Sequence, residues 1–172
     1  MIEFEKTYLA KHLPDLTKCK KKEVFDIYIP KSEHHPILRI RKNGDKYEMT
    51  KKQPVKGTDS SVQREDTIVL TEEEFKELSQ LHGKRVRKIR HYYDYKGHTA
   101  EIDVFQDDLK GLVLVDFEFD CDEDKESFEM PDFCLVEVTQ ETFLAGGMLC
   151  GKKYADIEKE LTRYNYTKLS LP

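Results

Sequence analysis

Apolar and polar residues alternate along most of the chain, and this pattern predicts β-strands. Successive side chains of a strand point to opposite faces, so a period of two marks strands with one apolar face and one polar face. Turn-forming residues separate these segments from one another. Strands therefore dominate the predicted fold. They cover residues 2–9, 23–29, 36–42, 46–53, 64–70, 85–95, 98–106, 112–120 and 134–138.

A capping box predicts the first helix. Thr71 takes the N-cap position and Glu74 the N3 position, so that each side chain pairs with the other residue's backbone amide. Apolar residues follow at helical spacing on one face, and Gly83 can end the helix. The residues on that face are Phe75, Leu78 and Leu81.

Two further helices are predicted nearer the carboxyl end. Residues 122–130 form a short acidic helix anchored by Phe128, and residues 153–164 carry apolar side chains at helical spacing. Residues 140–149 are a weaker helix candidate, because a pair of glycines lowers their helix propensity. Residues 54–61 are expected to form a mobile surface loop.

Five short stretches alternate like charges with an apolar residue at strand period. Each presents two like charges on one face of its strand, and these repel each other unless an opposite charge lies between them. A cationic face suits phosphate and an anionic face suits a metal ion, so a chain with both points to a metal-bound polyphosphate. The stretches are Glu3-Phe4-Glu5, Arg39-Ile40-Arg41, Lys88-Ile89-Arg90, Glu101-Ile102-Asp103 and Asp116-Phe117-Glu118.

Turn length determines which strand residues face each other. The dipeptide Asn43-Gly44 favours a two-residue turn, which pairs Arg41 with Lys46 and Arg39 with Glu48. The face shared with the two arginines then consists of Lys46, Glu48, Thr50 and Lys52. A three-residue turn would instead place there Tyr47, Met49 and Lys51.

A second predicted hairpin brings cations and carboxylates onto one face of the sheet. A two-residue turn at Lys96-Gly97 places Arg90 opposite Asp103 and Tyr92 opposite Glu101. The charged face is then either open to water or the inside of a closed barrel. The other face is apolar enough to be covered by helices. It carries Leu38, Ile40, Ile89, Ile102, Val104, Val115, Phe117 and Phe119.

Length and composition narrow the classes of protein. A chain of 172 residues predicts a single domain over residues 1–172. The net charge of −5 and the mixing of acids with bases argue against a nucleic-acid or membrane partner. The amino terminus lacks the apolar core of a signal peptide, and the four cysteines are widely spaced. We therefore expect a cytoplasmic protein with reduced cysteines.

Six motifs follow one another along the chain. They are Glu3-Phe4-Glu5-Lys6-Thr7 with Leu13-Pro14 after it, Arg39-Ile40-Arg41, Tyr47-Glu48-Met49-Thr50-Lys51-Lys52, Lys88-Ile89-Arg90, Glu101-Ile102-Asp103-Val104-Phe105 and Leu114-Val115-Asp116-Phe117-Glu118. In this order and spacing the chain resembles the CYTH domain, or triphosphate tunnel metalloenzyme, superfamily over nearly its whole length. That superfamily includes inorganic triphosphatases, thiamine triphosphatases, class IV adenylate cyclases and RNA triphosphatases.

The resemblance implies an α+β fold in which an eight-stranded antiparallel closed β-barrel forms a tunnel, with a charged lumen and helices packed outside. Two positions depart from the family pattern. Thr7 stands where the amino-terminal signature has a lysine that contacts the phosphate chain or the attacking water. Residues 141–147 do not match the Asp-x-x-Tyr-x-Asn-like stretch in the helix that closes the tunnel.

The resemblance also assigns roles to the charged residues. Mg²⁺ or Mn²⁺ is the expected cofactor, because such hard cations bind carboxylates together with substrate phosphates. The basic residues expected to grip a triphosphate are Arg39, Arg41, Lys52, Lys88 and Arg90. The carboxylates expected to hold the metal are Glu3, Glu5, Asp116 and Glu118, with Glu101 and Asp103 either joining them or orienting the basic side chains. Glu3, Glu5 and Glu118 are the catalytic candidates.

The expected activity is metal-dependent hydrolysis of a triphosphate, with inorganic tripolyphosphate as the first substrate to try. A class IV-type adenylate cyclase and a non-catalytic binder of polyphosphate or nucleotide are the alternatives. The expected partner is a small molecule that contains a triphosphate. A monomer and a homodimer both remain open.

Overall fold

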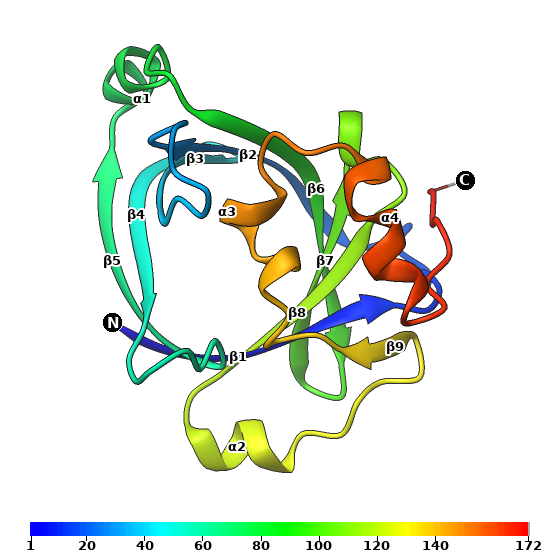
Figure 1. The fold of residues 1–172 in the computed structure, drawn as a ribbon. Helices are drawn as coiled ribbons and strands as arrows, with labels where there is room; N and C mark the ends of the chain where they lie inside the picture. The colour runs from blue at the N-terminus through cyan, green and yellow to red at the C-terminus, as the bar shows by residue number, and fades with distance from the viewer. Residues whose placement is uncertain (172) are drawn as a thin grey trace.

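Eight strands form a closed antiparallel β-barrel in the computed structural model, which describes residues 1–171 (Figure 1). Around the barrel the order is β5-β4-β3-β2-β6-β7-β8-β1, and β1 pairs with β5 to close the ring. A short ninth strand, β9, pairs with the second half of β1. The strands are β1 Ile2–Ala10, β2 Lys20–Ile29, β3 Leu38–Asn43, β4 Lys46–Pro54, β5 Val62–Leu70, β6 Lys84–Tyr95, β7 His98–Phe105, β8 Val113–Phe119 and β9 Cys134–Glu137. The predicted barrel is confirmed.

The helices are short and lie outside the barrel wall or across one of its ends (Figure 1). Thr71 and Glu74 form the predicted capping box at the start of the first helix. Leu81 lies beyond that helix and is exposed, so the helix is shorter than predicted. The α-helices are α1 Glu72–Leu78, α2 Asp122–Ser127, α3 Gly146–Leu149 and α4 Tyr154–Thr162, and the 3₁₀ turns are η1 Asp107–Leu109 and η2 Thr142–Leu144. None of the helices in residues 1–171 is long and apolar enough to cross a lipid bilayer.

Of the two predicted hairpin registers, one is confirmed and the other is wrong. At Lys96-Gly97 both residues have positive φ, and Tyr95 pairs with His98 as predicted. At the other hairpin Asn43 stays in β3 and pairs with Lys46, because Gly44 takes the first central position with φ +60°. Arg41 therefore faces Glu48 and Arg39 faces Thr50, so the predicted partners were wrong. The shift is an even number of residues, so the predicted shared face is retained.

The lumen changes character along the barrel. Its middle section carries the alternating charged residues, whereas one end is filled by apolar side chains that lie on the same strand faces. We call this end the apolar floor, and it consists of Leu9, Tyr28, Val86, Phe105 and Leu114. The floor packs against residues of η2, α3 and α4, namely Leu144, Leu149, Tyr154, Ile157 and Leu161. The segment that contains α3 therefore closes this end of the barrel (Figure 1).

In place of the predicted helix over residues 140–149 the structure has η2 and α3, separated at Ala145, and the two glycines of α3 pack tightly. A Cβ atom on Gly146 would lie 2.1 Å from the hydroxyl of Tyr28, and one on Gly147 would lie 2.1 Å from the carbonyl oxygen of Pro36. Glycine is required here because the backbone of α3 approaches the barrel too closely for any side chain. Residues 141–147, which depart from the family pattern, thus overlap the segment that closes the barrel. We call this segment, residues 142–149 with η2 and α3, the plug.

A second apolar core covers the outer face of β7, β8 and β1. Phe128 anchors the segment after α2 on this face, with its ring centroid 4.5 Å from that of Phe117. The anchor role predicted for Phe128 is confirmed. With the outer face of β7, β8 and β1 covered by this core and one end closed by the segment of η2 and α3, the charged section lies in the polar interior of the barrel.

Candidate active site

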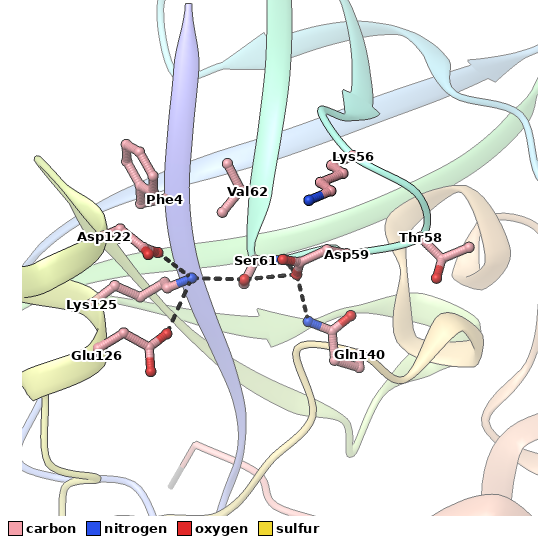
Figure 2. Close-up of a pocket in the computed structure, with 10 residues that line it drawn as sticks. All are labelled: Phe4, Lys56, Thr58, Asp59, Ser61, Val62, Asp122, Lys125, Glu126 and Gln140. Carbon is pink, nitrogen blue, oxygen red and sulfur yellow. Dashed lines mark hydrogen bonds and ion pairs between the residues drawn. The ribbon is translucent and has the colours of Figure 1, made fainter.

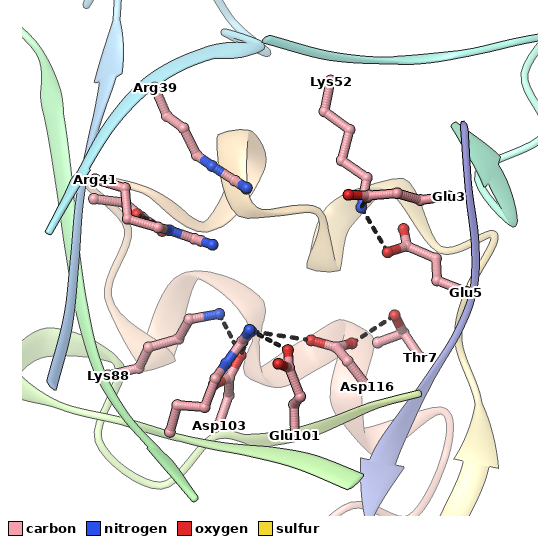
Figure 3. A network of polar contacts seen from close by, with 12 residues as sticks. Glu3, Glu5, Thr7, Arg39, Arg41, Lys52, Lys88, Glu101, Asp103 and Asp116 are labelled. Atoms are coloured by element: carbon pink, nitrogen blue, oxygen red, sulfur yellow. Dashed lines mark hydrogen bonds and ion pairs between the residues drawn. The ribbon is translucent and has the colours of Figure 1, made fainter. Parts of the chain in front are cut away.

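All the charged residues predicted to form the site lie on the lumen face of their strands. Figure 3 shows Arg39 and Arg41 on one side of the lumen and Glu3 and Glu5 on the other, pointing toward a shared space. Strand alternation produces this arrangement, because each motif places its charges two residues apart. The predicted set is Glu3, Glu5, Arg39, Arg41, Lys52, Lys88, Arg90, Glu101, Asp103, Asp116 and Glu118.

Lys52 bridges the two glutamates of the first strand. Its Nζ lies 2.8 Å from Oε2 of Glu3 and 2.6 Å from Oε2 of Glu5. Burial alone lowers the pKa of Lys52, but the two carboxylates outweigh this effect and raise it. The Lys52 ammonium therefore sits between two carboxylates at a place where a metal cation would be equally favoured.

Arg90 is held by carboxylates from the adjacent strand, as the hairpin predicts. Its Nε and Nη2 each lie 2.7 Å from an oxygen of Asp103, which is a bidentate pair, and its Nη1 bonds to Glu101. Lys88 also bonds to Asp103. Asp103 is fully buried, and although burial raises its pKa, Arg90 and Lys88 bring the pKa well below its usual range. Asp103 therefore orients two basic side chains.

Arg41 has a buried partner that the sequence did not reveal. Its Nε and Nη2 lie 2.6 Å and 2.8 Å from the two oxygens of Asp26 on β2. Burial raises the pKa of Asp26, but the Arg41 guanidinium outweighs it and lowers the pKa to about 2. Arg39 differs from both other arginines, because its closest carboxylate contact is 3.4 Å from Glu65 and its Nε has no partner. Arg39 is therefore the least neutralised arginine of the lumen.

Like charges also face each other on neighbouring strands. Glu5 pairs with Glu118, and Glu101 pairs with Asp116. Desolvation together with the charges of Glu101 and Glu3 raises the pKa of Glu118 to about 7. Burial likewise raises the pKa of Glu5 and of Glu101. Carboxylates that repel one another in this way are stabilised by a bound cation.

The donor set fits a hard divalent metal in its chemistry. Only carboxylate oxygens are offered, which Mg²⁺ and Mn²⁺ prefer. Within residues 1–171, however, no three potential ligands converge on one point in this conformation. Since Lys52 occupies the space between Glu3 and Glu5, metal binding there requires its ammonium to move aside.

Three polar residues of the lumen were missed by sequence reasoning. Asp26 is the one charged residue in a largely buried stretch of β2, where Phe25 and Ile27 flank it. A single charge among apolar residues is the sequence signal that could have identified it as a lumen residue. Gln63 donates a 2.6 Å hydrogen bond to Oε1 of Glu5, and Glu65 pairs with Lys52 across β4 and β5. Neither lies in a charge-alternating motif. The pairing of β5 with β4 identifies Glu65, and the closure of β5 onto β1 identifies Gln63.

Comparison with known proteins identifies the family. The CYTH domain matches residues 3–132, which is most of the chain. The chain belongs to the CYTH family. No curated protein matches it by sequence.

Solved structures share the CYTH barrel. The crystal structure of the inorganic triphosphatase NE1496 superimposes with a TM-score of 0.63 at 25% identity, covering 87% of this chain and 95% of that chain. A second structure, described as the hypothetical protein NE1496, gives 0.64 at 27% identity, covering 88% and 99%. A conserved hypothetical protein from Pyrococcus furiosus, at 22% identity and a TM-score of 0.50, covers 72% and 82% and shares the fold.

Thr7 is the position where this CYTH domain departs from the amino-terminal signature. Its hydroxyl donates a 2.7 Å hydrogen bond to Oδ1 of Asp116, and its backbone N–H donates to Oγ1 of Thr139 at 3.1 Å. The side chain faces the lumen between Glu5 and the floor residue Leu9 (Figure 3). A neutral hydroxyl therefore replaces a cation beside the carboxylates.

Proposed function

We propose that this protein is a metal-dependent triphosphatase whose substrate binds in the charged section of the lumen. The observation that carries the proposal is the meeting of basic and acidic side chains on facing walls of one barrel interior. Membership of the CYTH family and the likeness to the inorganic triphosphatase NE1496 support the same reaction class. Inorganic tripolyphosphate is the first substrate we propose.

The basic side chains grip the phosphate chain. Arg39 is best placed for first contact, because its guanidinium is the least neutralised. Arg41 and Arg90 each present their remaining N–H groups from a bidentate pair with a buried aspartate, which fixes the orientation of the planar fork. Lys52 and Lys88 complete the set as compact point charges. Holding the chain in this way supplies the positioning on which phosphoryl transfer depends.

The carboxylates explain why a metal is needed. The predicted set contains six carboxylates and five basic side chains, so a polyanion alone would meet no net positive charge from these residues. Bound Mg²⁺ or Mn²⁺ would neutralise the transferring phosphoryl group and polarise an attacking water. Glu3, Glu5, Asp116 and Glu118 would hold it, while Glu101 and Asp103 orient Arg90 and Lys88. Lys52, which now bridges Glu3 and Glu5, would have to leave them when they hold a metal, and its ammonium would then be available to phosphate.

Glu118 is suited to a proton-dependent role. Its pKa of about 7 leaves it part protonated near neutral pH, and its side chain reaches solvent. In the metal-free lumen Glu118 can therefore take up and release a proton near neutral pH, and a metal held there would compete with that proton. The proposed catalytic set of Glu3, Glu5 and Glu118 thus consists of three metal ligands, one of which exchanges a proton for the metal near neutral pH.

The test is a product assay with tripolyphosphate and with ATP, each with Mg²⁺ and with Mn²⁺. Metal-dependent release of orthophosphate is expected. Formation of cyclic AMP and pyrophosphate from ATP would instead establish a cyclase, and tight binding without turnover would establish a binder. Either of the last two results, with tripolyphosphate left intact, contradicts the proposal.

Variants locate the activity. Arg39→Ala and Glu5→Ala should each abolish metal-dependent phosphate release. Lys52→Ala should reduce it strongly, whereas Lys51→Ala should leave it unchanged, since Lys51 is the neighbouring residue on the exposed outer face of β4. Equal effects of the two lysine variants would place the reaction outside the lumen.

A further inference from the structure

Gln63 joins the lumen to a turn on the surface. Its Nε2 donates to Oε1 of Glu5 at 2.6 Å and to the carbonyl oxygen of Ser60 at 2.9 Å. Both partners can only accept, so the amide must present its nitrogen to them and both of its hydrogens are used. Lys52 holds the other oxygen of Glu5. When Lys52 leaves, Gln63 is the contact that still fixes the Glu5 carboxylate.

The turn that holds Gln63 is itself held in place. Oδ1 of Asp59 accepts from the backbone N–H of Ser61 at 2.9 Å, from the Ser61 hydroxyl at 2.8 Å and from Nε2 of Gln140 at 2.9 Å (Figure 2). Oε1 of Gln140 in turn accepts from the backbone N–H of Ser60 at 3.1 Å. Both ends of the Gln140 amide therefore bind this turn and tie it to the segment that leads into the plug.

A buried lysine of α2 also holds this turn, and we call Lys125 and Gln140 together the clamp. Lys125 is 4% exposed, and its Nζ donates to the Ser61 hydroxyl at 2.8 Å and pairs with Asp122 at 2.8 Å (Figure 2). The carbonyl oxygen of Ser61 accepts the backbone N–H of Glu5 at 3.0 Å. Burying a lysine costs free energy unless its charge is paired and hydrogen-bonded, as the charge of Lys125 is here. The turn is thus fixed against Glu5 at both backbone and side chain.

We propose that Gln63 is a positioning residue for Glu5, and that the turn Asp59–Ser61, clamped by Lys125 and Gln140, sets the place of Gln63. This inference rests on the proposed function only in taking Glu5 as a metal ligand. Hydrogen bonds to a ligating carboxylate fix its direction, and their loss weakens metal binding about 10- to 100-fold. The clamp therefore makes the metal affinity of the lumen depend on contacts at the surface.

The central test compares Mn²⁺ binding by wild type, Gln63→Met and Gln53→Met, measured by electron paramagnetic resonance of free Mn²⁺ without any substrate. Methionine keeps the length of the side chain and removes both donors. Gln53 pairs with Arg64 on the neighbouring strand but lies exposed on the outer face, so it is the matched control. Gln63→Met should raise the dissociation constant at least about tenfold, and Gln53→Met should not change it.

Kinetics provide a second readout. At saturating metal Gln63→Met should recover the kcat of wild type and its KM for tripolyphosphate, because the hydrogen bonds of Gln63 go to Glu5 and Ser60 and not to the basic residues. Lys125→Met should weaken Mn²⁺ binding in the same direction from outside the lumen, and Lys125→Arg should restore it. These two variants test the clamp even if Gln63→Met does not fold.

The outcomes separate the two proposals. Wild-type protein that binds Mn²⁺ and hydrolyses tripolyphosphate, while Gln63→Met and Lys125→Met bind Mn²⁺ equally well, overturns the inference and leaves the proposed function standing. Wild-type protein that binds no Mn²⁺ overturns both. Weaker Mn²⁺ binding in both variants with an unchanged control supports the inference.

Discussion

The hydroxyl of Thr7 donates a hydrogen bond of 2.7 Å to Oδ1 of Asp116, directly across β1 and β8. This contact satisfies one oxygen of a carboxylate whose other oxygen lies 3.6 Å from Nη2 of Arg90. Thr7 therefore completes the hydrogen bonding of an acidic residue and adds no positive charge to the lumen.

A cation at this position should strengthen the grip on substrate. We expect Thr7→Lys to raise kcat/KM for tripolyphosphate about tenfold, since a hydrogen bond to a charged group contributes about 1.5–3 kcal/mol. Steady-state kinetics at saturating Mg²⁺ check this. Thr7→Val, which removes only the hydroxyl, is the control and should not increase the rate. If Thr7→Lys behaves as wild type, residue 7 does not reach the bound phosphate.

The pair of Asp26 with Arg41 should matter greatly for stability. Asp26→Asn leaves the Arg41 charge buried without its counter-ion, and breaking a buried pair costs about 3–5 kcal/mol of unfolding free energy. Denaturant unfolding measures this loss. The double variant Asp26→Asn/Arg41→Met should be less destabilised than Asp26→Asn alone, because no unpaired charge remains. Additive losses would show that the two residues are not coupled.

The same pair predicts a dependence on acid. Asp26 has its folded-state pKa lowered from 3.8 to about 2, so its contribution to stability is complete above the unfolded value. That contribution disappears as the pH falls from about 4 toward 2. Between pH 5 and pH 2.5, Asp26→Asn should therefore lose less unfolding free energy than wild type does. Parallel losses in the two proteins would contradict the assigned pairing.

Proton release from Glu118 should govern metal affinity near neutral pH. Its pKa of about 7 means that a proton competes with the metal below that pH, so affinity should fall as the pH decreases from 8 to 6. The limit is about tenfold per pH unit for release of one proton. Titration calorimetry with Mn²⁺ at several pH values measures it. Glu118→Gln should bind more weakly at pH 8 and lose most of this dependence.

His91 should make the fold sensitive to mild acid. It is 3% exposed on the outer face of β6, its Nδ1 has no hydrogen-bond partner, and burial lowers its pKa from 6.5. A lowered histidine pKa means that stability is complete above 6.5 and is lost as the pH falls through the folded-state pKa. Denaturant unfolding at pH 7.5 and pH 5 should show a smaller loss for His91→Gln than for wild type.

The sequence predicts the strands well because strong local signals bound them, whereas the closed barrel was implied by the resemblance to the CYTH superfamily. Lys96-Gly97 sets a register that depends only on turn length, and so the pairing of Arg90 with Asp103 follows from the chain itself. At Asn43-Gly44 the same rule gives the wrong partners, because the two-residue turn lies one residue later in the chain, at Gly44 and Asp45. Gly44 alone takes the left-handed conformation there, and the dipeptide does not reveal which of its residues stays in the strand.

Contacts between distant strands could not be predicted in the same way. Asp26 and Arg41 meet because β2 lies beside β3 across a long connection, and Gln63 meets Glu5 because β5 closes onto β1. The apolar floor likewise depends on contacts between strands that are distant in the sequence. Each of its residues continues a charged alternation, as Leu9 does after Glu3, Glu5 and Thr7, and only closure of the barrel gathers them at one end.

The apolar floor also determines which end of the barrel is open to small molecules. At the opposite end the lumen-side positions carry solvent-exposed charged residues, namely Lys20, Lys46 and Glu118. Because the apolar floor closes one end of the barrel, a substrate of the proposed reaction would enter, and its products would leave, through the opposite end. Under the proposed function, a phosphate product that stays bound would exclude the next triphosphate, and a long polyphosphate would insert only one of its ends.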